Sequence, residues 1–161
     1  MSSERYSITI RRGALVRIAR AVAASSTETG GKLIGRYDVT EGTAHFVVLD
    51  YIDSGPRAES STTHLAPDGQ YQEAVFQLLE NYDGSLEHIG TWHSHHCNGL
   101  QSLSQGDMTG YVETAANPRY SPPYFLAILV TASRRQNAAC RTTSSHGMAS
   151  TGKWTTPPSA L

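Results

Sequence analysis

Two histidines separated by a single residue, and followed by a serine and an aspartate, set the strongest constraint on how this chain can fold. They form the pattern His93-Ser94-His95, eight residues, then Ser104-x-x-Asp107. Residues two positions apart on an extended strand project to the same side, so both imidazoles can face one point. The aspartate must then reach that point from a following helix. The sequence therefore predicts a strand, a loop and a helix start that converge.

This set of side chains is typical of a catalytic zinc site. Two histidines and one aspartate supply three protein ligands and leave the fourth position to water, whose pKa zinc lowers from about 15.7 to roughly 7. A nearby carboxylate that is not a ligand is then needed as general base. Glu28, in the upstream segment Glu-Thr-Gly-Gly, is the candidate. The sequence predicts one Zn²⁺ per chain, held by His93, His95 and Asp107.

The same residues resemble the JAMM motif of the JAB/MPN metalloprotease family. The resemblance is carried by Glu28 in ETGGKLIG, by His93 and His95 in GTWHSHH, and by Ser104 and Asp107 in SQGD. The segments SGPRAE (54–59) and PDGQYQ (67–72) are similar to stretches of bacterial members. The resemblance covers about residues 8–132.

The resemblance implies a role for each residue of the motif. Glu28 would be the general base, Ser104 would help to stabilise the tetrahedral intermediate, and the other three residues would hold zinc. It also implies an MPN/JAB-like fold, which is similar to that of cytidine deaminase. The implied activity is a deubiquitinase-like peptidase or isopeptidase that cuts after the C-terminal glycine of a ubiquitin-like protein, in precursor processing or deconjugation. Its partners would be that modifier, its conjugates and E1-like or E2-like enzymes of a bacterial system.

The chain departs from the family pattern in the loop between the histidines and the helix. Eight residues, 96–103, separate His95 from Ser104, which is one more than usual. His96 and Leu103 stand where the family often has proline. Because the spacing of Ser-x-x-Asp is kept, we expect an enlarged, less rigid loop and a preserved helix start.

Each of these residues has an ordinary explanation when it is taken singly. Paired histidines occur on strand surfaces, and an isolated Glu28 would be a solvated loop residue. Ser104-x-x-Asp107 is also the pattern of a helix capping box, although a capping aspartate can still face a metal. The combination in this order favours the zinc site. Two alternatives stay open: a non-catalytic MPN scaffold that binds partners, and a nucleic-acid-associated protein using Arg134, Arg135 and Arg141.

The remaining histidines are not expected to bind the metal: His96 is expected in the loop or at the rim of the substrate site, and the others at surface or half-buried positions. Cys97 is expected to be structural. His96 faces away from its neighbour His95 on a strand, and Cys97 has no second cysteine at short spacing. No partner stands at ligand spacing from His45, His64, His88 or His146. Trp92 is expected to pack in the sheet behind the metal, and residues 53–66 are a candidate flap over the site.

Length and charge limit the class of protein. The 161 residues suit a single domain, with a core at about 8–132 and a weakly defined segment at 133–161. A net charge of −1 gives no footprint for nucleic acid or an anionic membrane. The longest apolar run, YFLAILV at 124–130, is far shorter than the roughly 20 residues of a membrane span. With two cysteines and no secretory signal, the sequence predicts a cytoplasmic protein.

Hydrophobic periodicity predicts an α/β or α+β fold, with one mixed, curved sheet flanked by about three helices. Strands are expected at 6–10, 32–37, 44–52, 87–95 and 123–132, the second and third forming a hairpin. One or two further edge strands are expected beyond residue 133. Helices are expected at 15–22, at 67–82 and at 104–116. In the second helix the apolar stripe is expected to face the core, and it consists of Tyr71, Ala74, Val75, Leu78, Leu79 and Tyr82.

Overall fold

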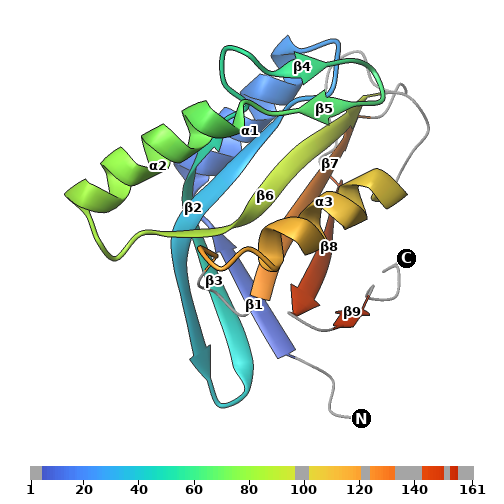
Figure 1. The fold of residues 1–161 in the computed structure, drawn as a ribbon. Helices are drawn as coiled ribbons and strands as arrows, with labels where there is room; N and C mark the ends of the chain where they lie inside the picture. The colour runs from blue at the N-terminus through green and yellow to red at the C-terminus, as the bar shows by residue number, and fades with distance from the viewer. Residues whose placement is uncertain (1–4, 97–101, 121–123, 133–142, 151–152, 156–161) are drawn as a thin grey trace.

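The structure, a computed structural model, describes residues 5–96, 102–120, 124–132, 143–150 and 153–155 (Figure 1). The helices among these residues are α1 (Arg12–Ala24), α2 (Gly69–Tyr82) and α3 (Gln105–Ala115). The strands are β1 (Arg5–Ile10), β2 (Gly30–Thr40), β3 (Thr43–Asp53), β4 (Glu59–Ser60), β5 (Leu65–Ala66), β6 (Glu87–His96), β7 (Tyr124–Ala132), β8 (Thr143–Ser150) and β9 (Lys153–Thr155).

Seven of the strands form one curled sheet in the order β1-β3-β2-β6-β7-β8-β9 (Figure 1). β1 runs parallel to β3 and β6 runs parallel to β7, whereas the other neighbours are antiparallel. The remaining strands, β4 and β5, form a separate two-stranded arm. The expected mixed sheet is therefore confirmed, and the histidine strand β6 lies near its centre.

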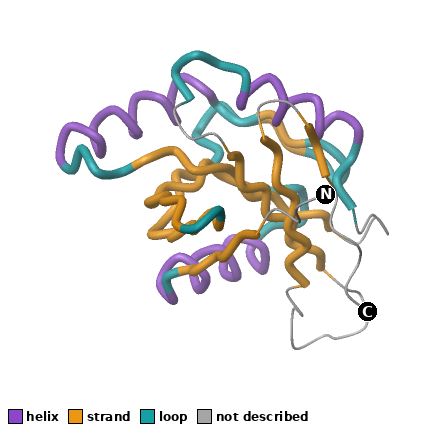
Figure 2. Tube along the Cα trace, turned by 90° about the horizontal axis from the view of Figure 1, so that it is seen from below, coloured by secondary structure: helices purple, strands orange, loops and turns teal. Residues whose placement is uncertain are grey.

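Helices cover both faces of the sheet. Figure 2 shows α2 and α3 on one face and α1 on the other. Strand β7 is apolar from Phe125 to Val130 because its side chains serve both layers. Phe125 and Ala127 pack with α3, and Leu126, Ile128 and Val130 belong to the core cluster that includes α1. The continuous apolar run in the sequence is thus a central strand buried on both sides.

Local signals explain where several elements begin and end. The β2–β3 hairpin turns at Glu41 and Gly42, whose φ angles of 52° and 74° fit the positive values that a tight two-residue hairpin turn requires. Asp68 caps α2 by accepting a hydrogen bond from the Tyr71 backbone N–H. Ser104 caps α3 through the expected capping box with Asp107. The predicted helix start after the enlarged loop is therefore confirmed, while loop residues 97–101 lie outside the described residues.

One expectation about α2 is wrong in part. Tyr71, Val75 and Leu79 of the predicted stripe are half-buried, whereas Leu78 is 71% exposed and Tyr82 is 92% exposed, so only part of the stripe faces the core. The buried position of this helix is Gln72, whose side-chain amide donates to the Asp53 carbonyl at 2.8 Å. The Gln72 hydrogen bond turns this face of α2 toward the sheet, and Phe76 on the same face lies against Lys32 of β2 and His88 of β6.

The C-terminal segment adds two strands, as expected, with β9 at the sheet edge and β8 between β9 and β7. The arm β4–β5 falls within the expected flap at 53–66. Three sequence expectations lie outside the described residues: Cys97, the arginines at 134, 135 and 141, and the side chains of His96 and His146. No helix in the described part of the chain is long and apolar enough to cross a membrane.

Candidate metal centre

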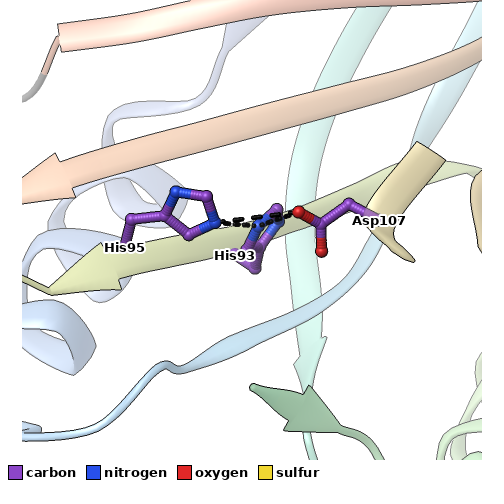
Figure 3. Close-up of side chains that lie close together, drawn as sticks. All are labelled: His93, His95 and Asp107. Atoms are coloured by element: carbon purple, nitrogen blue, oxygen red, sulfur yellow. Dashed lines mark hydrogen bonds and ion pairs between the residues drawn. The ribbon is translucent and has the colours of Figure 1, made fainter. Parts of the chain in front are cut away.

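The two histidines of β6 point to the same side of the strand, as their spacing predicts (Figure 3). Their Nε2 atoms lie 3.0 Å apart, and both side chains are buried, His95 to 2% exposure. β6 is paired with β2 on one side and with β7 on the other, so the backbone that carries the two rings is held in place. The strand therefore presents two adjacent nitrogen donors from a rigid support.

Asp107 reaches the same point from the first turn of α3 (Figure 3). Its Oδ2 lies 3.5 Å from His93 Nε2 and 3.7 Å from His95 Nε2. The same oxygen accepts a hydrogen bond from the Ser104 backbone N–H at 2.7 Å, which closes the capping box. The cap thus fixes the side-chain direction that a metal ligand would need.

These three atoms fit a zinc ion. A point equidistant from atoms with these separations lies about 2.0 Å from each of them, which matches the Zn–N and Zn–O distances found in proteins. Two imidazole nitrogens and one carboxylate oxygen are also the donor types that zinc takes in catalytic sites. Among the described residues these three side chains form a group that can hold a metal ion.

Glu28 arrives beside this group through strand pairing. β2 runs antiparallel to β6 with Gly30 opposite His93, so two residues earlier the chain passes His95. Glu28 is buried to 5% exposure, and its Oε1 lies 3.8 Å from His95 Nε2. Glu28 is 65 positions before His93 in the sequence, and the pairing of β2 with β6 places it next to the histidines.

Two sets of hydrogen bonds hold the Glu28 segment in position. Ser94, the residue between the histidines, donates its backbone N–H to the Thr29 carbonyl at 2.7 Å, and its Oγ accepts from the Thr29 N–H at 3.0 Å. The Glu28 N–H donates to the carbonyl of Ser61 in the arm at 2.8 Å. Ser94 thus serves the site by placing the glutamate, a role that the sequence reasoning missed.

Glycine at position 30 is required by close packing around this segment. A Cβ there would collide with the Trp92 carbonyl and would lie 2.8 Å from Leu65 Cδ2 and 2.9 Å from His93 Cβ. Only glycine lets β2, β6 and the arm approach so closely beside Glu28. The Glu-Thr-Gly-Gly segment is therefore explained by packing as well as by the glutamate.

The pKa values of Glu28 and Asp107 are shifted in opposite directions. Burial raises the pKa of Glu28, and the adjacent imidazoles only partly offset this effect. Burial also raises the pKa of Asp107, but hydrogen bonds with His93 and Ser104 outweigh it and hold the Asp107 pKa well below its usual range. Asp107 therefore has the character of a permanent anion, as a metal ligand must be, and Glu28 that of a carboxyl which binds protons more readily.

Ser104 lies at the rim of the same group. Its Oγ accepts a hydrogen bond from the Asp107 N–H at 3.1 Å, and its hydroxyl also interacts with the Asp107 carboxylate. Ser104 lines the pocket beside the histidines. To donate to a substrate oxygen, the hydroxyl would have to turn from Asp107 into the pocket.

Tyr111 is a further residue of the site that the sequence analysis did not identify. Its Oη forms a 2.7 Å hydrogen bond with His93 Nδ1, on the side of the ring away from Asp107. Burial raises the pKa of Tyr111 far above its usual value, so it stays a neutral phenol. A partner on the second nitrogen fixes the tautomer and orientation of a ligating histidine. The signal was available, since Tyr111 follows Asp107 by four residues and so shares its helix face.

One pocket of about 660 Å³ joins these elements. Its lining includes Glu28, His95, Ser104 and Asp107, and it extends between α2 and α3 beneath the arm. A volume of this size is in the range of ordinary ligand sites. The residues of the motif therefore open onto a space that a substrate can enter.

The fold has a solved counterpart. The solution structure of protein DSY2949 from Desulfitobacterium hafniense is similar, with a TM-score of 0.57 and 17% sequence identity over 88% of this chain and 84% of that one. At this identity the likeness shows the fold alone. No protein-family model matches the sequence, and a search of curated proteins finds no match. Arguments about function therefore rest on the geometry of the site.

The other described histidines lie outside the group of His93, His95 and Asp107, although His64 and His88 line the pocket. His45 bonds to Ser7, and His88 donates from Nε2 to the Gly90 carbonyl at 2.9 Å. His64 stands on the arm and lines the pocket. Trp92 is fully buried behind His93, as expected, with its ring 5.1 Å from that of Tyr51.

Proposed function

We propose that this chain is a zinc-dependent peptidase or isopeptidase, with an MPN/JAB-like fold, that cuts after the C-terminal glycine of a ubiquitin-like protein. The observation that carries the proposal is the convergence of His93, His95 and Asp107 at distances suited to one zinc ion, with the Glu28 carboxylate beside them. Side chains from three separate segments meet inside a pocket.

Each residue then has a task in amide hydrolysis. His93, His95 and Asp107 hold the ion, which when bound supplies Lewis-acid chemistry to the carbonyl and to water. Glu28 takes a proton from the attacking water and later passes it to the leaving amine. Ser104 donates a hydrogen bond to the developing oxyanion once its hydroxyl turns toward the pocket.

The substrate class comes from the resemblance to JAMM proteases. Such a substrate has an extended tail that ends in glycine, joined to a following residue or to a lysine side chain. The partners of the chain would then be a ubiquitin-like protein, its conjugates, and the E1-like or E2-like enzymes that attach it. The pocket beneath the arm supports this proposal because Glu28, His95 and Asp107 all line a space of about 660 Å³.

The proposal is tested with a fusion in which a ubiquitin-like protein ending in Gly-Gly is followed by a short peptide. We expect zinc-loaded protein to cut the fusion after the second glycine, a chelator to abolish cutting, and added zinc to restore it. An intact fusion in the presence of fully zinc-loaded protein would contradict the proposal. Zinc binding without cutting of any conjugate would favour the scaffold alternative.

Replacing Glu28 by glutamine tests the base separately from the metal. Glu28→Gln keeps the shape of the side chain but cannot accept the proton, so we expect hydrolysis to fall by about 10² to 10⁴-fold while zinc content stays at the wild-type level. Glu59→Gln, an exposed glutamate on the arm, is the matched control and should cut normally. The base assignment fails if Glu28→Gln is active or has lost its zinc.

A further inference from the structure

The pocket continues beyond the metal centre into a recess between α2 and α3. We use this name for the part of the pocket lined by Phe76, His88, Gly110, Tyr120 and Phe125. None of these residues takes part in the proposed hydrolysis. The recess is nonetheless continuous with His95 and Asp107, because all of them line the same pocket.

Aromatic rings form an unbroken wall from the metal centre into the recess. Tyr111, which bonds to His93, has its ring centroid 5.3 Å from that of Phe125. Phe125 in turn lies 5.5 Å from Tyr120 and 6.0 Å from His88. The wall ends at Phe76 on α2, 6.4 Å from His88. Ring centroids at these spacings are in the range where aromatic groups attract one another, so a further ring fits this surface.

A cation holds the ring of Phe76 at the end of this wall. Lys32 Nζ lies 5.6 Å from the centroid of Phe76, and the Lys32 side chain is only 14% exposed. Glu73 balances its charge at 3.5 Å. The cation–π contact therefore fixes Phe76 as part of the aromatic surface that an occupant of the recess would meet.

The α3 side of the recess has free space at Gly110. Gly110 lines the pocket, and a Cβ added there would meet no atom within 4 Å. A larger side chain at this position can therefore enter the recess without displacing a neighbour.

We infer that this recess binds an aromatic side chain of the substrate, on the leaving-group side of the scissile bond. The inference rests on the proposed function. A tail that ends in glycine brings no side chain next to the metal centre, so we place the aromatic residue on the other side of the cut. The preferred substrate is then a precursor in which a phenylalanine or tyrosine comes directly after the glycine.

The first test compares hydrolysis of peptides that differ only in the residue after Gly-Gly. For wild-type protein we expect kcat/KM to be about 10 to 100 times higher with phenylalanine than with alanine at this position. Gly110→Leu fills the recess and should bring the two values close together. Gly13→Leu is the matched control, because a Cβ at Gly13 on α1 also meets no atom within 4 Å, and it should keep the preference.

A binding measurement separates failure of this inference from failure of the proposed function. NMR titrations of zinc-loaded Glu28→Gln protein give the Kd of each peptide without cutting. Tighter binding of the phenylalanine peptide, lost when Gly110→Leu is added, supports the recess even if wild-type protein hydrolyses nothing. Equal binding of the phenylalanine and alanine peptides overturns the inference, as does a preference that persists in Gly110→Leu, whether or not hydrolysis occurs.

Discussion

At the scale of single residues, the sequence predicted that His93, His95 and Asp107 converge, but it did not predict the groups that orient them. Two histidines on a strand and an aspartate in a helix's first turn have fixed directions, so their convergence follows from spacing. Tyr111 was missed because a tyrosine on an amphipathic helix is ordinarily a packing residue. Ser94 was missed because it faces away from its histidine neighbours, and its partner Thr29 is known only once β2 pairs with β6.

Tyr111 should tune zinc affinity without contributing to the chemistry. Tyr111→Phe keeps the ring but removes the hydrogen bond to His93 Nδ1. Loss of such a partner typically lowers metal affinity by about 10 to 100-fold, and competition with a chelator of known affinity measures the change. Tyr82→Phe, at an exposed tyrosine on α2, serves as control and should bind zinc like wild type. An unchanged Kd for Tyr111→Phe would show that the contact does not support the ligand.

At the scale of elements, helix ends were predictable and helix faces were not. Ser104 and Asp107 define the start of α3 from sequence alone, because the capping box is a local signal. Periodicity predicted one apolar stripe on α2, but only Tyr71, Val75 and Leu79 of that stripe are half-buried, because the inward face of the helix is centred on Gln72. The face that is used is set by the Gln72 hydrogen bond to Asp53, and a polar residue is not a signal for burial.

Ser104 combines a structural task with a proposed catalytic one, and two variants separate them. Ser104→Ala removes the cap, so we expect a loss of about 1 kcal/mol in the free energy of unfolding, measured with urea. It also removes the proposed oxyanion donor, which should lower kcat by about 10² to 10³-fold. Ser104→Thr keeps the hydroxyl and should retain most of both. Normal kcat in a destabilised Ser104→Ala protein would show that Ser104 acts only as the N-cap of α3.

At the scale of the whole molecule, the order of strands decides whether the site exists. The β2–β3 hairpin and the strand β6 were both predicted, but the pairing of β2 with β6 was not, since long-range pairing leaves no local mark. That pairing brings Glu28 opposite His95. The buried run of β7 was predicted as a strand, and its burial on both faces follows from the placement of α1 and α3 on opposite sides of the sheet.

The buried imidazole of His88 should make the fold sensitive to acid. Burial and the nearby Lys32 charge lower the pKa of His88 to about 3, although its bond to the Gly90 carbonyl opposes this. The unfolded chain therefore binds a proton below about pH 6.5 that the folded chain excludes. Stability contributed by neutral His88 is full above that value and falls as pH drops from about 6.5 toward 3.

Urea unfolding between pH 7 and pH 4, in the presence of a chelator so that zinc release is excluded, measures this effect. His88→Gln keeps a donor for the Gly90 carbonyl but does not titrate. We expect wild type to lose stability with a slope of up to about 1.4 kcal/mol per pH unit more than the variant. Parallel curves for the two proteins would show that His88 is not excluded from protonation in the folded state.

The location of a bound zinc ion tests the central claim most directly. Crystals of zinc-loaded protein, measured on both sides of the zinc absorption edge, reveal the ion by its anomalous signal. We predict one peak per chain at about 2.0 to 2.2 Å from His93 Nε2, His95 Nε2 and Asp107 Oδ2, with the Glu28 carboxylate nearby but not coordinated. A peak elsewhere, or no peak in protein soaked with excess zinc, would contradict it.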